Sequence, residues 1–150
     1  MSKCHGARKS ELSSRWFTPY SLFHQLDCEF GFTLDAAAEP EHHMCPVYYS
    51  TADDGLQQPW TGVVWCNPPY GRELYHWVRK AADSAREGAA VVMLLPSRTG
   101  AAWFHELALP LAEIRFIRGR LRFSGSKINA PFDSLIAVFK PPLDDAPGIE

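Results

Sequence analysis

The sequence predicts a single α/β domain, in which a compact, mostly parallel sheet has helices on both faces and an antiparallel edge. Two observations support this fold class. Short apolar runs typical of buried strands alternate with segments whose apolar residues recur at helical spacing. The composition, 46% hydrophobic and 21% charged over 150 residues, is that of a globular chain with room for one core.

The first part of the chain predicts one helix and one short strand before a long irregular stretch. Thr18-Pro19 is typical of a helix N-cap and first turn, and apolar residues at helical spacing continue to Glu29. Gly31–Ala36 predicts a short strand. Three prolines and a glycine interrupt residues 37–60, which predicts an irregular connection there.

The second part alternates strands and helices more regularly. In chain order it predicts a buried strand at 62–66, a helix at 72–86, the most hydrophobic strand at 89–96, a short helix at 101–109, and strands at 112–117 and 133–140. Ligands of such sheets bind outside the carboxyl ends of the strands. Asp35 and Asn67 each follow a predicted strand, so both are expected at that edge.

The two ends of the chain differ from its middle. We expect residues 15–140 to form the domain, residues 1–14 a mobile arm, and residues 141–150 a tail without apolar periodicity. The opening is polar and predicts no signal peptide, and no apolar run approaches the roughly 20 residues of a membrane span. A cytoplasmic location, no membrane partner, and a monomer or weak dimer are expected.

Charge and cysteine content restrict the partners. A net charge of −2 predicts no global attraction to nucleic acid. Local basic clusters are present near the N-terminus and in the last third of the chain, the second formed by Arg115, Arg118, Arg120, Arg122 and Lys127. Within it, the side chains of Arg118, Arg120, Arg122 and Lys127 fit either a loop that meets the phosphates of DNA or a solvated hairpin face.

The cysteines predict free thiols rather than a metal site. The four cysteines form no CxxC pair. A zinc set can be drawn from Cys4, His5, His42, His43 and Cys45, but its spacing matches no finger pattern. We therefore predict no metal.

The stretch VVWCNPPYG carries the most specific chemistry. The two prolines end the predicted strand and hold Asn67 in one orientation. The Asn67 amide oxygen and the Pro68 carbonyl could then both accept from one –NH2 group, and Tyr70 could offer a ring for a base to stack on. The plain alternative is a strand-ending turn with a core tyrosine.

NPPYG at Asn67–Gly71 resembles the catalytic motif of S-adenosylmethionine-dependent amino-methyltransferases, chiefly the N6-adenine DNA methyltransferases. The match is closest to the small phage-encoded Dam-type enzymes and runs from about Trp16 to Phe139. Further stretches share in it: TP, LDAAA, DDGL, VVMLLP, WFH, GRL and APF. The resemblance implies a Rossmann-like methyltransferase fold, S-adenosylmethionine as cofactor and DNA as partner, in a bacterial host's cytoplasm if the gene belongs to a phage.

The resemblance also implies roles in catalysis. Asn67 and the Pro68 carbonyl would hold the target amine, Pro69 would complete the rigid corner, and Tyr70 would stack on the flipped adenine. Phe132 would lie near the target base. Trp65 shares a strand face with Asn67 by parity and is expected to line the site.

Four residues are implied in holding the cofactor: Thr18, Pro19, Asp35 and Asp54. Each keeps a structural alternative. Thr18 and Pro19 fit an ordinary helix start, and Asp35 fits an N-cap for the alanines after it. Asp53 replaces Asp54 if the register is off by one.

The sequence departs from the family at the first cofactor motif. DAAAEPEHHM contains no glycine, whereas the family usually has a glycine-rich turn there. The usual acidic residue for the ribose hydroxyls has no clear counterpart, and Glu39 or Glu41 could serve.

The expected activity is methylation of the N6 amine of adenine in DNA. We expect recognition by loops 37–60 and 118–132 and the arm, and therefore a short or weakly selective target, since the chain has no room for a separate recognition domain. Two alternatives stay open: the same chemistry on RNA or a protein glutamine, and a catalytically silent DNA-binding relative.

Overall fold

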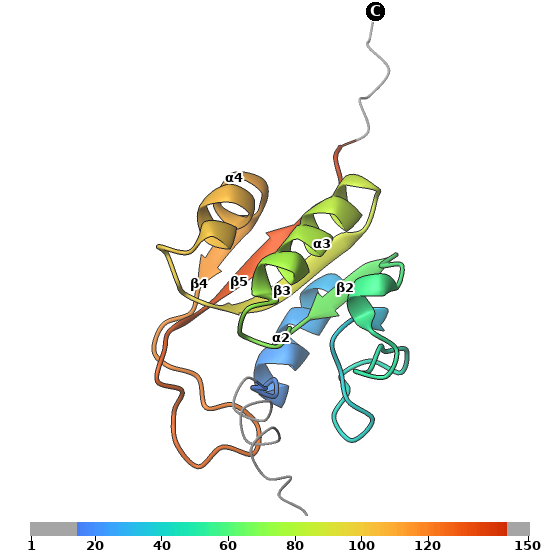
Figure 1. Cartoon of the computed structure of the whole chain (residues 1–150). Helices are drawn as coiled ribbons and strands as arrows, with labels where there is room; N and C mark the ends of the chain where they lie inside the picture. The colour runs from blue at the N-terminus through green and yellow to red at the C-terminus, as the bar shows by residue number, and fades with distance from the viewer. Residues whose placement is uncertain (1–14, 144–150) are drawn as a thin grey trace, which may run out of the picture.

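A computed structural model describes residues 15–143, which form a five-stranded sheet with helices on both faces (Figure 1). The predicted arm, most of the predicted tail, and Cys4 and His5 lie outside the described residues. The strands are β1 (Leu34–Asp35), β2 (Val63–Cys66), β3 (Ala90–Pro96), β4 (Glu113–Phe116) and β5 (Ser134–Phe139), in the order β1-β2-β3-β5-β4.

Four of the five strands run in the same direction. Strands β1, β2 and β3 pair in parallel, while β5 is antiparallel to both β3 and β4. The prediction of a mixed α/β domain is confirmed. The antiparallel region lies at the β4 side of the sheet, but the reversed strand is β5, one position in from the edge.

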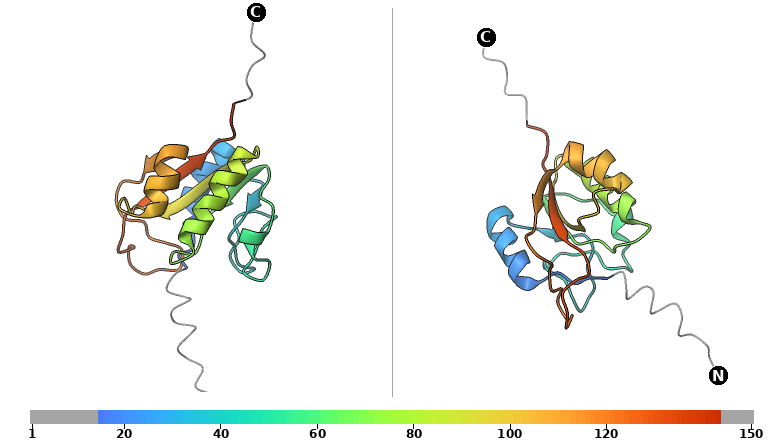
Figure 2. Two further views of the ribbon diagram at one scale, coloured as in Figure 1. Left: turned by 45° about the horizontal axis from the view of Figure 1, so that its top comes forward. Right: turned by 90° about the vertical axis from the view of Figure 1, so that its left-hand side faces the viewer.

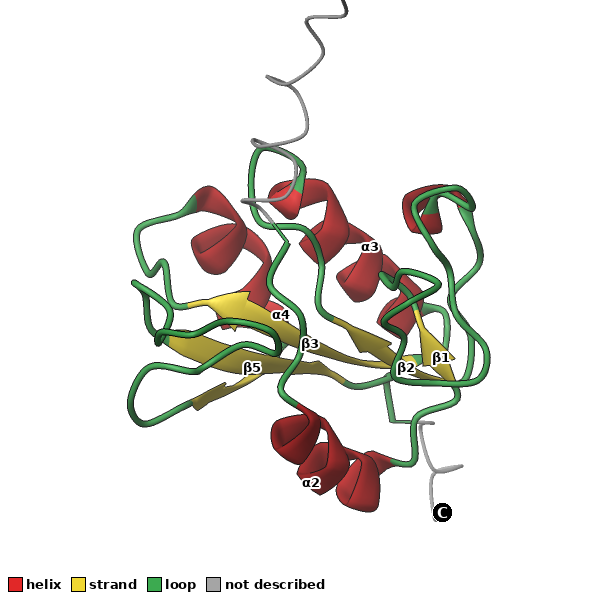
Figure 3. Cartoon of the chain, turned by 90° about the horizontal axis from the view of Figure 1, so that it is seen from below, coloured by secondary structure: helices red, strands yellow, loops and turns green. Residues whose placement is uncertain are grey.

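The helices divide between the two faces of the sheet. Helix α3 (Leu74–Arg86) and the helical segment of η2 (Phe104–Ala108, a π-helical turn) and α4 (Leu109–Leu111) cover one face, and α2 (Tyr20–Phe30) covers the other (Figures 2 and 3). Helix α3 buries Leu74, Trp77, Val78 and Ala81, the stripe that its sequence predicts.

Helix α2 begins one residue later than predicted. Pro19 is its N-cap, with φ −62° and ψ 129°, and no side chain caps the helix. The prediction of Thr18 as N-cap with Pro19 in the first turn is therefore wrong, which frees the Thr18 side chain for another contact. Gly31, at φ 69°, ends the helix and donates its N–H to Asp27.

The connection from β1 to β2, residues 36–62, contains only the short 3-10 helix η1 (Gly55–Gln57), as its breakers predict. It returns along the outer edge of β1, where the Asp35 N–H donates to Val47 at 3.0 Å and Asp35 accepts from Tyr49 at 2.9 Å. This pairing covers an otherwise open strand edge. Strand β1 is shorter than the predicted Gly31–Ala36.

The connection from β4 to β5, residues 117–133, lies at the same edge of the sheet as the carboxyl ends of β1, β2 and β3. This follows from direction, since β4 runs with those strands and β5 returns against them. Figure 1 shows the two long connections below the sheet, on opposite sides of the start of α2. No helix in residues 15–143 is long and apolar enough to cross a membrane.

Candidate active site

Asn67 lies where the sequence predicts it, directly after the last residue of β2. Strand β2 is buried between β1 and β3, and Pro68 is buried behind the turn. The two prolines have no N–H to donate to a ladder, so the strand stops and the chain leaves the sheet. The Asn67 side chain is thereby placed at the carboxyl edge.

The Asn67 amide nitrogen is held by the segment that precedes α2. Its Nδ2 donates to the Trp16 carbonyl and, at 3.1 Å, to the Thr18 hydroxyl. The amide oxygen, Oδ1, is buried, and no residue within 15–143 donates to it. A buried acceptor without a donor is costly, so this atom can receive a donor from outside residues 15–143.

Tyr70 does not present an open aromatic face. Its ring is buried, with 5% of the residue exposed, and its hydroxyl donates to the Leu94 carbonyl at 3.0 Å. Burial raises the pKa of this hydroxyl well above its ordinary value, so Tyr70 stays protonated. Stacking of Tyr70 on a base stays a prediction.

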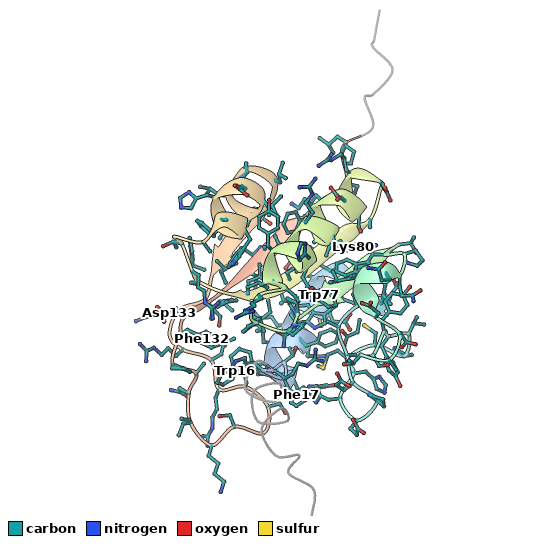
Figure 4. All side chains as sticks on the ribbon, viewed as in Figure 1. Trp16, Phe17, Trp77, Lys80, Phe132 and Asp133 are labelled. Carbon is teal, nitrogen blue, oxygen red and sulfur yellow. The ribbon has the colours of Figure 1, made fainter. Side chains whose placement is uncertain are left out.

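Phe132 lies beside the Asn67 corner, as expected. Its ring meets Tyr70 edge to face at 5.8 Å and Trp16 edge to face at 5.3 Å. Figure 4 shows Phe132 and Trp16 next to each other at the lower end of the sheet, with Phe17 close by. The role of Phe132 toward a base stays a prediction.

A narrow hollow opens on the α2 side of the corner; we call it the α2-side hollow. Asn67, Pro68, Thr18, Asp35 and Trp65 are among the residues that line it. The predicted parity of Trp65 and Asn67 is confirmed by this shared lining. The Trp65 indole nitrogen is buried and, like Asn67 Oδ1, has no partner among residues 15–143.

Asp35 is the buried carboxylate of this hollow. Its Oδ2 accepts from the Met44 N–H at 2.9 Å and its Oδ1 from the Ala37 N–H at 3.3 Å. Burial raises the pKa of Asp35 above its usual 3.8, although both N–H groups oppose the shift. The N-cap alternative for Asp35 is wrong, because no helix follows; the carboxylate instead holds the connection at Met44 against β1.

A second hollow, the α3-side hollow, lies on the other face of the same corner. It encloses about 380 Å³ including its open mouth, and Ala36, Ala38, Asp54, Pro69 and Trp77 are among the residues that line it. Arg15 and Ala37 line both hollows, so the two are contiguous across the Asn67–Pro69 corner.

The structure distinguishes Asp53 from Asp54, either of which the sequence allows as the predicted cofactor contact. Asp53 is engaged within its own turn, since its Oδ2 accepts from the N–H and the hydroxyl of Ser50 at 2.8 and 3.0 Å. Asp54 lines the α3-side hollow, is exposed, and has a left-handed φ of 54°. Such strained non-glycine residues cluster at functional sites, which favours Asp54 over Asp53.

Gly55 allows the 3-10 helix η1 to approach the end of β1 closely. A Cβ at Gly55 would lie 2.3 Å from the Ala36 carbonyl oxygen and 3.2 Å from the Trp77 ring. Only glycine lets η1 pack against the end of β1 in this way. The role of DAAAEPEHHM toward a cofactor stays a prediction.

The other residues predicted to hold the cofactor are Pro19 and either Glu39 or Glu41, and none of them lines either hollow. Pro19 caps α2. The Glu39 carboxylate pairs with Arg15 at 3.1 Å and accepts from the Thr51 hydroxyl at 2.5 Å, beside the α3-side hollow. Glu41 is exposed and lies farther out, next to Tyr20 and His43. The role of either glutamate toward a ribose stays a prediction.

The predicted basic cluster divides into four exposed side chains of the 117–133 connection and one that belongs elsewhere. Arg118, Arg120, Arg122 and Lys127 are exposed. Arg122 donates to the carbonyls of Ser126 and Lys127 at 3.1 and 2.8 Å, so its guanidinium braces the loop. Arg115 lies in β4, where it pairs with Glu29 of α2 at 2.7 Å, and it is not part of this surface.

The histidines and cysteines show no metal geometry. No group of three or more possible ligands gathers among residues 15–143. Burial raises the pKa of the Cys45 thiol to about 12, which keeps it protonated and a poor metal ligand. His43 stacks on Tyr48 at 4.1 Å, and burial lowers the pKa of the half-buried His42.

Sequence reasoning missed the segment Arg15–Phe17. Arg15 joins the two hollows, Trp16 supplies a carbonyl to Asn67, and the Phe17 carbonyl accepts from the Ser124 N–H at 2.9 Å. The signal in the sequence is the pair of adjacent aromatic residues Trp16 and Phe17, which follows the polar stretch directly.

Comparison with known proteins found two similarities. A family model described as DNA N-6-adenine-methyltransferase (Dam) matches residues 6–141. A protein of Escherichia phage T1, named DNA N-6-adenine-methyltransferase, is 36% identical over 109 residues, which cover 71% of this chain and 45% of the phage protein. The chain thus spans less than half the length of that relative.

Proposed function

The chain belongs to the DNA N-6-adenine-methyltransferase (Dam) family, and we propose that it transfers a methyl group from S-adenosylmethionine to the N6 amine of adenine in DNA. One observation carries the proposal. The Asn67 amide oxygen is a buried acceptor with no donor among residues 15–143, and it lies beside Pro68 where the two hollows meet. An exocyclic amine is the kind of group that this atom lacks.

The residues around the hollows fit the methyl donor. Asp54 could accept from the amine of its adenine, beside the small Ala36 and Ala38 and the ring of Trp77. The Asp35 carboxylate suits its ammonium group, and the unpartnered Trp65 N–H suits its carboxylate. When bound, the donor would supply a methyl group already activated by a sulfonium.

The chain's own residues would then act by positioning and polarisation. Asn67 Oδ1 and the Pro68 carbonyl would accept the two hydrogens of the target amine, which directs the nitrogen lone pair out of the base plane. Because Pro68 and Pro69 fix the backbone, this geometry exists before the substrate arrives. The rings of Tyr70 and Phe132 would receive the base after it leaves the duplex.

The surface toward DNA would be the basic 117–133 connection. Arg118, Arg120 and Lys127 are exposed there, and Arg120 has only a long contact of 3.9 Å to Asp133. Arg122 would contribute mainly by holding the loop in shape. The loop lies at the same edge as Asn67, so phosphate contacts there would bring the duplex to the corner.

We also assign the domain to the Rossmann-like methyltransferase class. The support is topological: four strands run one way, helices cover both faces, and the candidate ligand residues follow the carboxyl ends of β1 and β2.

The proposal is tested by incubating the purified protein with labelled S-adenosylmethionine and DNA, and digesting the DNA to nucleosides. N6-methyladenine is the expected product. RNA and protein are offered as substrates in parallel incubations. Label in RNA or in a protein glutamine but not in DNA would favour a methyltransferase that acts on those substrates. No product, together with no binding of S-adenosylhomocysteine at millimolar ligand, would favour a silent relative.

A further inference from the structure

We propose that Thr18 is a positioning residue for Asn67, which together with the Trp16 carbonyl determines which end of the Asn67 amide faces the substrate. The inference rests on the proposed function, since it concerns the same acceptor atom. It assigns Thr18 a role different from the cofactor contact that the family resemblance implies.

The hydrogen bonds of Asn67 define the orientation. A side-chain amide has two donors on its nitrogen and an acceptor oxygen, and rotation by 180° exchanges them. Here both donors are used, one on the Trp16 carbonyl and one on the Thr18 hydroxyl at 3.1 Å. The Trp16 carbonyl can only accept, so the rotated amide would place two acceptors against each other.

Thr18 completes this arrangement. With the hydroxyl present, the second N–H is satisfied and the oxygen is the one polar atom of the amide left for a ligand. Without the hydroxyl, a buried N–H would lose its partner, and the amide would gain by turning away. Thr18 is itself 3% exposed, so water cannot easily replace it.

The segment that carries the pair is fixed on both sides. Arg15 pairs with Glu39 of the β1–β2 connection at 3.1 Å, and the Phe17 carbonyl accepts from Ser124 of the β4–β5 connection at 2.9 Å. The Thr18 hydroxyl and the Trp16 carbonyl are 49 and 51 residues away from Asn67 in sequence, and these two anchors hold them in place beside its amide. This spacing fits a role in aligning the amide rather than in capping α2.

The test uses Thr18→Val, which keeps the side-chain shape and removes the hydroxyl, beside Thr18→Ser, which keeps the hydroxyl. Thr61→Val, at an exposed threonine ahead of β2 at the opposite end of the strand, is the matched control. The first readout needs no activity: hydrogen exchange of the Asn67 side-chain NH2 in ¹⁵N-labelled protein, its signal identified by its loss in Asn67→Asp.

We expect Thr18→Val to speed this exchange by about tenfold or more, with Thr18→Ser close to the unmodified protein. The second readout is kinetic. In Thr18→Val, kcat for DNA methylation should fall about tenfold, while the Kd for S-adenosylhomocysteine changes less than about twofold. Thr18→Ser should restore kcat.

Three results would overturn the inference. Unchanged exchange in Thr18→Val would show that the hydroxyl does not hold the amide. A weaker Kd for S-adenosylhomocysteine with normal kcat at saturating donor would make Thr18 a cofactor contact. Equal damage in Thr18→Ser would mark a packing role. If the unmodified protein methylates no DNA, the proposed function fails, but the exchange measurement still decides the role of Thr18.

Discussion

The two long connections on either side of Asn67 have opposite charge and different construction. Residues 37–60 contain Glu39, Glu41, Asp53 and Asp54 and no lysine or arginine, whereas residues 117–133 contain three arginines and a lysine with one aspartate. The first is paired to β1 and packed through Gly55. The second holds itself together through contacts such as Arg122 with its own carbonyls.

We propose that this difference corresponds to two different ligands. The methyl donor carries a sulfonium and an ammonium, so an acidic, closely packed wall suits it. DNA carries a line of phosphates, so an exposed basic loop suits it. Asn67 lies between the two connections. Substitutions in one connection should weaken the binding of its own ligand and leave the binding of the other ligand unchanged.

Among substitutions in the two connections, the largest effect is expected from the basic side. Replacing Arg118, Arg120 and Lys127 together by alanine should weaken DNA binding by roughly 10- to 100-fold at low salt and reduce the salt slope by about 2 to 3. S-adenosylhomocysteine binding should not change. Arg79→Ala with Arg86→Ala, two exposed cations of α3, is the matched control. An unchanged salt slope in the triple variant would place the DNA elsewhere.

Asp54 tests the acidic side. Asp54→Ala removes a carboxylate from the α3-side hollow and should raise the Kd for S-adenosylhomocysteine by about tenfold or more, as loss of a hydrogen bond to a charged group does. DNA binding should stay the same. Glu87→Gln, after the end of α3 and away from the hollows, controls for net charge. If Asp53→Ala weakened donor binding more than Asp54→Ala, the structural choice between them would be wrong.

Gly55 tests the packing of the acidic connection. Gly55→Ala places a Cβ 2.3 Å from the Ala36 carbonyl, which must shift, so we expect a loss of about 1–3 kcal/mol of stability together with weaker donor binding. Thermal unfolding and calorimetry measure both. Gly100→Ala, where a Cβ meets nothing within 4 Å, should have neither effect.

A smaller effect is expected from pH. The pKa of Asp35 is raised from 3.8, chiefly because burial disfavours its charged form. A cationic donor prefers the ionised carboxylate, so donor affinity should be full above this raised pKa and fall as pH drops through it. Asp35→Asn should remove that decline. A decline of the same size in Asp35→Asn would assign it to another group.

The sequence predicted those parts of the site that follow from local rules. Asn67 could be placed because proline must end a strand, and the stripe of α3 because helical spacing selects one face. Asp53 and Asp54 could not be ordered, since both fit the same turn, and only the left-handed φ of Asp54 and the hydrogen bonds of Asp53 distinguish them.

The missed features depend on contacts between distant parts of the chain. Thr18 carries an ordinary helix-start signal, and its contact with Asn67 spans 49 residues. The burial of Tyr70 depends on Leu94 in the next strand. Likewise, alternation of strands and helices gives no information on the place of β5, which enters between β3 and β4.

The central claim, that Asn67 holds the target amine, is tested most directly by single-turnover methylation of DNA with Asn67→Ala. The amide removed acts on the reacting nitrogen, so we expect the rate to fall by about 100-fold or more, with binding of DNA and of S-adenosylhomocysteine within about threefold of the unmodified protein. A variant that methylates adenine as fast as the unmodified protein would contradict the account.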